Sequence, residues 1–449
     1  MRYIDSLNIS NNTECFILIE PGIGYIIPIL LEKFLNSKII VLHIDNSFLS
    51  YRFACNRTAA LFNAEHNNVW DFLEKEISDT DAARIKIIEW RPSLNFYKEK
   101  YIKLLSLTVD YIKQMDAGRR TVNAFGKRWI LNFFKNLGII KYPLLYRTMN
   151  IPIIITGSSP SLEKSIPVIH SLQESCFIIA ASSSVMALLH SGIKADMIIA
   201  ADGGTWALRH IYPALRETVF NSLFAANLSA ALPSQCRNFP FLIINDGSLW
   251  QSIVLSSLEL PSVMIPQKGT VTASAIELAM LLSSSNIYLA GIDLDISDIR
   301  THTRPYSFDS IFNSASSRFN PLYSQIFTRS VLLKSGGSMD IYLSWFKKQF
   351  FVWPKRIFSL DNPKIFSVSI PSIVSKTEKN FFSVYDIKKD PLCFKETGIK
   401  ALIAALKDQR YSKELNQELV PLLFPKTDCG YDDNVNDRDL IYYLENYIK

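Results

Sequence analysis

The sequence predicts an α/β protein whose central domain is a Rossmann-like parallel sheet. Short apolar segments in the middle of the chain each end in a polar or glycine-containing turn, and segments with helical periodicity lie between them. Near-continuous apolar strands that alternate with helices are typical of a parallel sheet covered on both faces. The segments are IPIIITG, CFIIAAS, DMIIAAD, SLFAAN, FLIIND, SVMIP and NIYLAGIDL.

The composition is that of a globular protein. The chain has 449 residues, of which 48% are hydrophobic and 20% are charged, so two or three domains are expected. The net charge of +6 suits an anionic ligand such as a nucleotide but is too small to indicate nucleic-acid binding. The 6 cysteines are scattered singly, which favours a cytoplasmic protein without zinc knuckles or disulfides. We expect no secretory signal and no membrane span.

The patterns divide the chain into consecutive regions. Residues 1–80 are expected to form a smaller α/β domain, and residues 81–145 a helical connector. Residues 146–345 are expected to form the central sheet domain. Residues 346–449 begin with strand-like pieces and then become mainly helical.

The first domain opens with the segment CFILIEPGIGYIIPILLEKFLNSKIIVLHID. This segment predicts a strand, a glycine turn, a helix and a second strand that ends in Asp45. Pro28 must then lie in the first turn of the helix. Gly22 and Gly24 supply only half of a dinucleotide-binding fingerprint because a third glycine is missing. A tight strand-to-helix turn is therefore the simpler interpretation.

Polar residues follow almost every strand predicted for the central sheet. Ligands of parallel α/β sheets bind beyond the carboxyl ends of the strands, so the repetition favours a polar ligand cleft there. Loop solubility explains part of the pattern. The strand exits carry Gly157, Ser158, Ser159, Ser183, Asp202, Gly203, Asn227, Asp246 and Asp293.

Two segments predict a helix start that suits a phosphate. In ITGSSPSLEK, Ser159 is expected to be the N-cap and Pro160 the first helical residue. In QKGTVTASAIELAMLL, a glycine and hydroxyl residues precede a second helix. A plain capped helix start is the alternative in both places. The residues concerned are Ser158, Ser159, Ser161, Lys268, Gly269, Thr270 and Thr272.

The carboxylates and a histidine loop are the candidates for chemistry. Asp202 and Asp293 could hold ribose hydroxyls, bind Mg²⁺ or cap a neighbouring helix. His302 lies in a loop with Arg300 and Tyr306, and could accept a proton from an acceptor hydroxyl. The arginines of the loop could offset the charge of a departing phosphate. An exposed histidine without a catalytic role is the alternative.

In their order along the chain, these motifs resemble the motility-associated-factor (Maf) flagellin glycosyltransferases and their wider DUF115, or MptE-like, group. The similar segments include IEPGIGYIIPILLEKF, FGKRWILNFFKNL, IPIIITGSSPSL, HSGIKADMIIAADGG and GTVTASAIELAMLL. They continue with IYLAGIDLDIS and THT. Each motif alone is modest, but together in register they are fairly specific. The segment around THT is also distantly similar to bacterial CMP-sialic-acid sialyltransferases.

The resemblance implies a cytoplasmic glycosyltransferase with a sialyltransferase-like central domain. Such an enzyme moves a nonulosonic acid of the pseudaminic or legionaminic type from a CMP-activated donor to Ser or Thr of flagellin, as flagellar assembly and motility require. It needs no cofactor, with Mg²⁺ left open, and neither nucleic acid nor stable membrane insertion is implied. His302 and Asp293 become the catalytic candidates. The implied substrate site consists of Gly157, Ser158, Ser159, Ser161, Ser183, Asp202, Gly203, Asn227, Asp246, Gly269, Thr270, Thr272, Arg300 and Tyr306.

The chain also departs from these families. Ser335 stands where the sialyltransferases have a general-base histidine, so His302 substitutes for it or the mechanism differs. Ser158 and Ser159 replace small Gly or Ala residues, and Ile292 replaces a common Gln, which leaves the exact donor open.

Two other functions fit the same motifs. One is a 6-hydroxymethylpterin pyrophosphokinase-like enzyme that uses ATP and Mg²⁺, with Asp202 and Asp293 as metal ligands. The other is a catalytically inactive flagellin-binding protein that has kept the fold.

Overall fold

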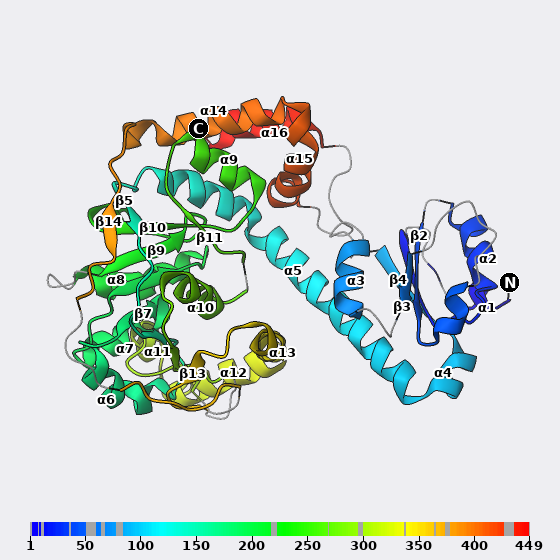
Figure 1. Cartoon of the computed structure of the whole chain (residues 1–449), viewed down its shortest axis with the longest axis horizontal. Helices are drawn as coiled ribbons and strands as arrows, with labels where there is room; N and C mark the ends of the chain where they lie inside the picture. The colour runs from blue at the N-terminus through cyan, green and yellow to red at the C-terminus, as the bar shows by residue number, and fades with distance from the viewer. Residues whose placement is uncertain are drawn as a thin grey trace. The chain divides into compact units, whose positions relative to one another are not determined.

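The chain forms two compact units (Figure 1). We call residues 1–124 and 423–435 the N-terminal unit, and residues 125–422 and 436–449 the central unit. The division falls within the long helix α5 (Glu99–Leu137). The computed structural model describes residues 2–7, 9, 13–35, 37–50, 60–63, 68–77, 84–216, 222–267, 269–294, 300–335, 338–362, 365–372, 378–425 and 435–448.

The N-terminal unit contains a 4-stranded parallel sheet in the order β3-β2-β1-β4. Helix α2 (Ile26–Lys33) joins the first two strands and has Pro28 in its first turn, as expected. Apolar residues of β1 are buried on both faces of the sheet, with Phe16 and Leu18 on one face and Ile17 and Ile19 on the other. The strands are β1 (Cys15–Ile19), β2 (Lys38–His43), β3 (Ala60–Asn63) and β4 (Ile85–Glu89).

The predicted end of this domain at residue 80 is too early. Strand β4 starts at Ile85 and pairs with β1 along its whole length. The first part of α5 adds Tyr101 and Leu104 to the same core. Because β4 is an edge strand in which only Ile88 is fully buried, its polar residues dilute the apolar pattern that would reveal it.

The central unit contains a 10-stranded sheet in the order β13-β12-β6-β7-β8-β9-β10-β5-β14, with β11 paired to β10. Every pairing is parallel except that of β14 with β5. The predicted α/β class and the predicted central strands are therefore confirmed. The strands are β5 (Tyr142–Tyr146), β6 (Ile153–Thr156), β7 (Phe177–Ala181), β8 (Met197–Ala200), β9 (Leu223–Asn227), β10 (Pro240–Asn245), β11 (Val263–Met264), β12 (Ile287–Ala290), β13 (Ile357–Ser359) and β14 (Phe382–Val384).

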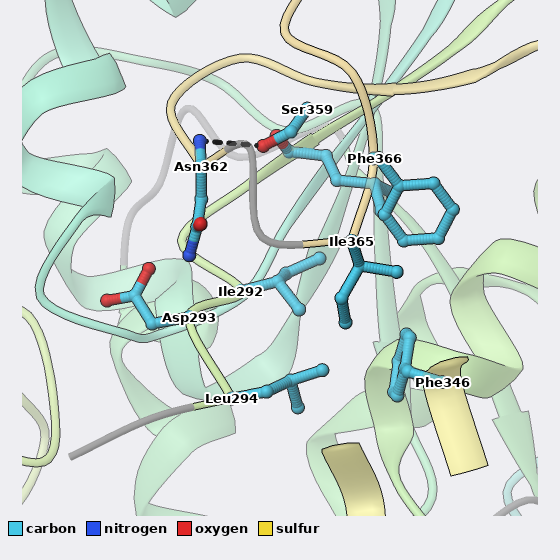
Figure 2. Close-up of a pocket in the computed structure, with 9 residues that line it drawn as sticks. Ile292, Asp293, Leu294, Phe346, Ser359, Asn362, Ile365 and Phe366 are labelled. Atoms are coloured by element: carbon cyan, nitrogen blue, oxygen red, sulfur yellow. Dashed lines mark hydrogen bonds between the residues drawn. The ribbon is translucent and has the colours of Figure 1, made fainter. Parts of the chain in front are cut away.

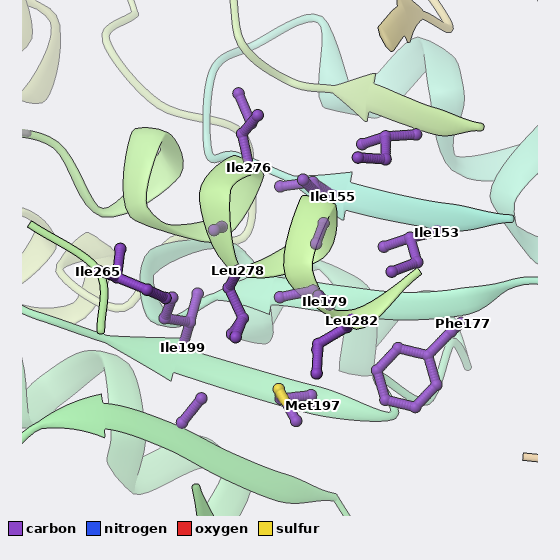
Figure 3. Packing of buried hydrophobic residues seen from close by; sticks show 14 of the residues in the cluster. Ile153, Ile155, Phe177, Ile179, Met197, Ile199, Ile265, Ile276, Leu278 and Leu282 are labelled. Atoms are coloured by element: carbon purple, nitrogen blue, oxygen red, sulfur yellow. The ribbon is translucent and has the colours of Figure 1, made fainter. Parts of the chain in front are cut away.

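Helix α10 (Val271–Leu282) covers one face of the central strands (Figure 3). Its Ile276 and Leu282 pack in one cluster with Ile155 and Ile179 of the sheet. The strand residues that alternate with these and point to the opposite face of the sheet are buried too. Ile178, for example, has no exposed surface. Burial on both faces explains why these strands are apolar throughout rather than alternating.

The other helices connect the strands or cover the sheet. Among the residues placed here, no helix is both long enough and apolar enough to cross a bilayer. The helices not yet given are α1 (Arg2–Asp5), α3 (Val69–Glu76), α4 (Arg91–Tyr97), α6 (Leu162–Leu172), α7 (Val185–His190), α8 (Leu208–Arg216), α9 (Leu249–Ser257), α11 (Asp309–Ser314), α12 (Leu322–Ser335), α13 (Ser338–Val352), α14 (Phe394–Leu406), α15 (Gln409–Leu423) and α16 (Asp437–Tyr443).

The C-terminal region, predicted as a separate domain at residues 346–449, largely completes the central unit. Strand β13 pairs with β12, and β14 pairs with β5. Helix α14 lies along α9 (Figure 1), where a Cβ atom on Gly398 would come within 2.7 Å of Val254. These contacts join elements that are far apart in the sequence, so the helical pattern alone does not reveal them.

Helix α15 also holds the start of α9. The carboxylate of Glu418 accepts hydrogen bonds from the backbone N–H groups of Leu249 (2.8 Å) and Trp250 (3.0 Å). These are N–H groups that the first turn of a helix leaves without an internal partner. Burial raises the pKa of Glu418, although the two hydrogen bonds act to lower it.

This raised pKa predicts a measurable pH dependence of stability. A carboxyl group with a raised pKa in the folded state contributes most to the free energy of unfolding below its ordinary pKa of 4.5. Its contribution falls as the pH rises through the folded pKa. We therefore expect Glu418→Gln to gain melting temperature relative to the wild type between about pH 4 and about pH 7.

The matched control is Glu445→Gln, which changes an exposed carboxyl group near the end of the same unit and is not among the groups that shift the pKa of Glu418. It should follow the wild type across the same pH range. A melting temperature of Glu418→Gln that falls relative to the wild type as the pH rises would contradict the sign of this pKa shift.

Candidate functional site

The carboxyl ends of the parallel strands form one edge of the central sheet. Polar residues end or follow six of these strands. In the order of the sheet, this row runs from Asp293 after β12 to Asp246 after β10. Five strand spacings of about 4.8 Å give the row a length of roughly 24 Å, which is too long for one small ligand. From one end to the other the row is Asp293, Gly157, Ser183, Asp202, Asn227 and Asp246.

A cavity of about 560 Å³ lies at the middle of this edge. Its volume is in the range of pockets that bind small molecules. From the predicted set it brings together Ser183, Asp202, His302 and Tyr306. The full lining is Ser182, Ser183, Asp202, Trp206, Ala207, His210, Val271, His302, Tyr306, Phe308 and Ile311.

The loop that carries His302 is bonded to the start of α6. The N–H group of Thr303 donates to the carbonyl oxygen of Ser158 at 2.8 Å. The N–H group of Arg304 donates to the carboxylate of Glu163 at 2.9 Å. These bonds hold the backbone directly after His302, so the position of its ring is set by the helix start.

The side chain of Arg300 is bonded to the same helix. Its guanidinium group donates to Glu163 at 2.8 Å, in an ion pair that is partly buried. Arg300 and Arg304 line a neighbouring cavity of about 30 Å³, which shares His302 and Tyr306 with the larger one, and they are absent from the lining of the larger cavity. The ion pair thus gives Arg300 a structural task, and its predicted contact with a substrate phosphate remains a prediction.

His302 stacks on one ring of an aromatic cluster in the larger cavity. Its imidazole stacks on Tyr306 with ring centroids 4.1 Å apart and planes at 16°. Its Nδ1 atom lies 2.8 Å from the hydroxyl oxygen of Thr301. Tyr306 in turn lies 5.3 Å from the ring of His210 and 5.5 Å from that of Phe308. Stacking and the hydrogen bond fix the orientation of the His302 ring.

Several residues of the lining were missed by the sequence analysis. Trp206 is 65% exposed, although its ring lies 6.0 Å from that of Phe308. The guanidinium carbon of Arg209 lies 5.7 Å from the centroid of Trp206, which is the geometry of a cation–π contact. Trp206 and His210 are four residues apart after the DGG turn, a spacing that places them on one helical face. That spacing was the available signal.

Asp202 and Gly203 follow strand β8, and each has its own contacts there. One carboxylate oxygen of Asp202 accepts from the N–H group of Gly204 at 2.7 Å, which closes a turn. Burial raises the pKa of Tyr342, and the charge of Asp202 raises it further. A Cβ atom on Gly203 would lie 2.4 Å from the ring of Trp129, so packing against α5 explains this glycine.

The exits of β6 and β12 touch through their backbones. A Cβ atom on Gly157 would lie 2.4 Å from the carbonyl oxygen of Gly291, and one on Gly291 would lie 2.7 Å from that of Gly157. The direction of the strand order changes between these two strands, where ligands of α/β sheets commonly bind. Here the two glycine backbones occupy that point, and the larger cavity lies beside it.

Asp293 is bonded to the start of α6. Its carboxylate accepts from the N–H group of Ser161 at 3.2 Å, and its own N–H group donates to the hydroxyl of Ser159 at 3.2 Å. The helix begins at Leu162, so the N-cap residue is Ser161, without a side-chain capping bond. The expected cap at Ser159 is therefore wrong. The carboxylate of Asp293 supplies the acceptor from a neighbouring strand exit instead.

Figure 2 shows the surroundings of Asp293 on its other side. It lines a cavity of about 10 Å³ together with Asn362 and apolar residues that include Phe346 and Phe366. Such a volume has room for about one water molecule. Asp293 does not line the larger cavity, so its catalytic role remains a prediction.

Asn227 and Asp246 belong to a hydrogen-bonded network at the far end of the row. The side-chain amide of Gln251 donates to Asp246 at 2.8 Å, and its oxygen lies 3.4 Å from the amide nitrogen of Asn227. Asp246 also accepts from the hydroxyl of Ser248 at 2.7 Å and from Gln267 at 3.0 Å. Hydrogen bonds within the local turn thus explain why Asn227 and Asp246 are polar. Both residues lie outside the lining of the larger cavity.

The start of α10 reaches the cavity. Thr270 is the N-cap residue, and its hydroxyl accepts from the N–H group of Ala273 at 3.1 Å. Gly269 has a φ of +74°, a conformation that favours glycine. Thr272 lies in the first turn, and Val271 beside it lines the cavity. The positive end of this helix dipole is therefore at the edge of the cavity.

The remaining candidates add no metal site. Lys268 lies outside the described residues, and Ser335 is the last residue of α12. Within the described part of the chain, no group of three or more His, Cys, Asp or Glu residues could hold a metal ion. Three strand spacings of about 4.8 Å separate the exits of Asp202 and Asp293, so these carboxylates are too far apart to share one Mg²⁺.

Comparisons with known proteins find similar chains. An uncharacterised protein of Treponema pallidum (strain Nichols) is 26% identical over 277 residues, which cover 61% of this chain and 59% of that protein. A solved structure of a Maf glycosyltransferase from Magnetospirillum magneticum AMB-1 is 16% identical, with a TM-score of 0.47. The match covers 90% of this chain and 64% of that one. This chain thus spans less than two thirds of the length of either relative.

A family model described as "6-hydroxymethylpterin diphosphokinase MptE-like" matches residues 127–298. The matched range contains Ser183, Asp202 and the start of α10, and it ends just before His302. The resemblance that the motifs predicted is thereby confirmed for this range. Residues 127–298 are therefore similar to the MptE-like family over somewhat more than a third of the chain.

Proposed function

We propose that this protein is a glycosyltransferase that moves a nonulosonic acid of the pseudaminic or legionaminic type from a CMP-activated donor to Ser or Thr of flagellin. One observation carries the proposal: the cavity joins Asp202 and Ser183, at the sheet edge of the region similar to the MptE-like family, to His302 from the following loop. The order of the motifs along the chain supports the choice of donor and acceptor.

In this proposal, each side of the cavity has its own task. The donor phosphate lies at the start of α10, where Val271 reaches the cavity and the helix dipole favours an anion. Asp202 and the hydroxyl of Ser183 bind hydroxyl groups of the donor. The aromatic rings around His302 exclude water from the reacting atoms.

The proposed reaction is a displacement at the anomeric carbon of the sugar. The hydroxyl oxygen of the acceptor Ser or Thr attacks this carbon, while the bond between the carbon and the phosphate oxygen of the donor breaks. CMP leaves with both electrons of that bond. His302 takes the proton of the acceptor hydroxyl, because a neutral imidazole can act as a general base.

The pyrophosphokinase alternative is supported by the description of the matching family model. It requires ATP with Mg²⁺, and the proposed ligands Asp202 and Asp293 line different cavities. Because they cannot share an ion, we favour the glycosyltransferase. The inactive flagellin-binding alternative predicts that the flagellin mass does not depend on this protein.

Ligand stabilisation separates the first two functions. We expect CMP, at about 100 times its Kd, to stabilise the folded protein by about 2.7 kcal/mol, and ATP with Mg²⁺ to have no such effect. Asp202→Asn should weaken the shift in melting temperature that CMP causes, whereas Asp246→Asn, at a strand exit outside the cavity, should leave it intact. Stabilisation by ATP with Mg²⁺ alone would select the pyrophosphokinase.

The reaction itself is tested on flagellin. The protein, a CMP-activated nonulosonic acid and unmodified flagellin are incubated together, and the intact mass of flagellin is measured. The proposal predicts a mass increase of one or more sugar residues. An unchanged mass in the presence of a donor that binds the protein would favour the inactive binding protein.

A further inference from the structure

The N-terminal unit has the architecture of a nucleotide-binding half-domain. In its strand order, β3-β2-β1-β4, the direction changes beside β1, where α/β sheets commonly bind ligands. The turn after β1 contains Gly22 and Gly24 with φ angles of +60° and +73°. The positive φ accounts for Gly22, and a Cβ atom there would meet nothing within 4 Å, so the space beside this turn is open.

A buried glutamate joins this turn to the exit of β2. Glu20 is fully buried and has a φ of +42°, a strained conformation for this residue. Its carboxylate accepts from the N–H group of Asp45 at 3.0 Å and is bonded to Nδ1 of His43 at 3.1 Å. The glycine turn and Asp45 therefore lie side by side.

Asp45 is held at this edge by hydrogen bonds to both of its carboxylate oxygens. One carboxylate oxygen accepts from the N–H group of Ser47 at 2.9 Å, and the other accepts from the hydroxyl of Tyr97 at 3.2 Å. The pKa of Asp45 is lowered, chiefly by its hydrogen bonds to Ser47. An ionised carboxylate at the end of the second strand is the group that binds ribose hydroxyls in nucleotide-binding folds.

Two buried polar atoms beside Asp45 supply an independent observation. The Nε2 atom of His43 and the side-chain oxygen of Asn46 have no hydrogen-bond partner among the described residues. The His43 side chain has no exposed surface. Since buried polar groups are nearly always hydrogen-bonded, this pair at one strand exit indicates a binding partner for it.

We propose that the N-terminal unit binds a ribonucleotide at the exits of β1 and β2, with the ribose hydroxyls on Asp45 and the phosphate at the turn from Gly22 to Gly24. This site is separate from the cavity of the central unit and does not rest on the glycosyltransferase proposal. Ile27 stands where dinucleotide-binding folds have a third glycine, and it is buried against the sheet. The side chain of Ile27 prevents the close approach of helix and strand that a third glycine allows, which favours a mononucleotide over a dinucleotide.

Equilibrium dialysis of the full chain tests this proposal, with labelled AMP, GMP and UMP as probes; CMP is left out because it is expected to bind the central cavity. At least one of them should bind, and its 2′-deoxy counterpart should bind at least about tenfold more weakly because Asp45 loses a hydroxyl partner. Asp45→Asn should cause a similar loss. This variant retains an oxygen that can accept from Ser47, so the turn is preserved.

Matched variants separate this site from the central cavity. Glu32→Gln changes an exposed carboxyl group of α2, and Asp202→Asn changes the central cavity; neither should affect the binding. Tyr97→Phe, which removes only the hydroxyl bonded to Asp45, should weaken binding if Asp45→Asn does not fold. The proposal is overturned if no probe binds at millimolar concentration. It is also overturned if binding is lost in Asp202→Asn but unchanged in Asp45→Asn, a result that would leave the glycosyltransferase proposal standing.

Discussion

His302→Ala is expected to lower the rate of sugar transfer to flagellin by about 10²–10⁴-fold, the usual contribution of a general base. The ring that would accept the proton is held in the cavity by stacking on Tyr306 and by the hydrogen bond to Thr301. Alanine removes the proton acceptor but leaves Asp202 and Ser183 in place. Binding of CMP should therefore persist, and the loss should lie in the rate of transfer rather than in donor affinity.

Another histidine provides the control for this experiment. His190 ends α7 on the exposed surface and is absent from the lining of the cavity. His190→Ala should retain the transfer rate of the wild type. Transfer by His302→Ala at the wild-type rate would remove His302 from the mechanism and return attention to Asp293 or to another acceptor of the proton.

Gly291→Ala is expected to destabilise the central unit by roughly 2–5 kcal/mol, because two costs add at this position. Its φ of +65° is unfavourable for alanine. The new methyl group would also lie 2.7 Å from both the carbonyl oxygen of Gly157 and the Cβ atom of Leu162. Neither contact can relax by rotating a side chain, so the exits of β6 and β12 must separate. Chemical denaturation measures the loss.

Gly192→Ala isolates the contribution of the close contact. Gly192 has a φ of +69°, almost the same as Gly291, but a Cβ atom there would meet nothing within 4 Å. Gly192→Ala should lower the free energy of unfolding by only about 1–2 kcal/mol, which is the cost of the backbone conformation alone. Equal losses in the two variants would show that the approach of Gly157 and Gly291 is not tightly packed.

Strands that are buried on both faces could be predicted from the sequence, whereas exposed edge strands could not. Residues of β6 and β7 are buried on both faces, and their uninterrupted apolar runs were sufficient for the prediction. In contrast, β14 is short and mostly exposed at the edge of the sheet, so it leaves little apolar pattern. The placement of the C-terminal helices depends on contacts with α9 that no local pattern encodes.

The site was predictable only as a set of strand exits. The sequence could assign Asp202 and Asp246 to one edge of a sheet, but not the order of the strands, which decides the distance between them. It could not separate the capping task of Asp293 from catalysis, because that bond crosses from one strand exit to another. The stacking of Tyr306 on His302 likewise requires the path of the loop in three dimensions.

The bonds between the loop and α6 have a consequence for protein engineering. Exchanging the His302 loop for that of a related protein would not by itself reproduce the arrangement of the cavity. Ser158 and Glu163, which receive the loop, lie in another part of the chain. A functional chimaera would need to inherit both segments from the same parent.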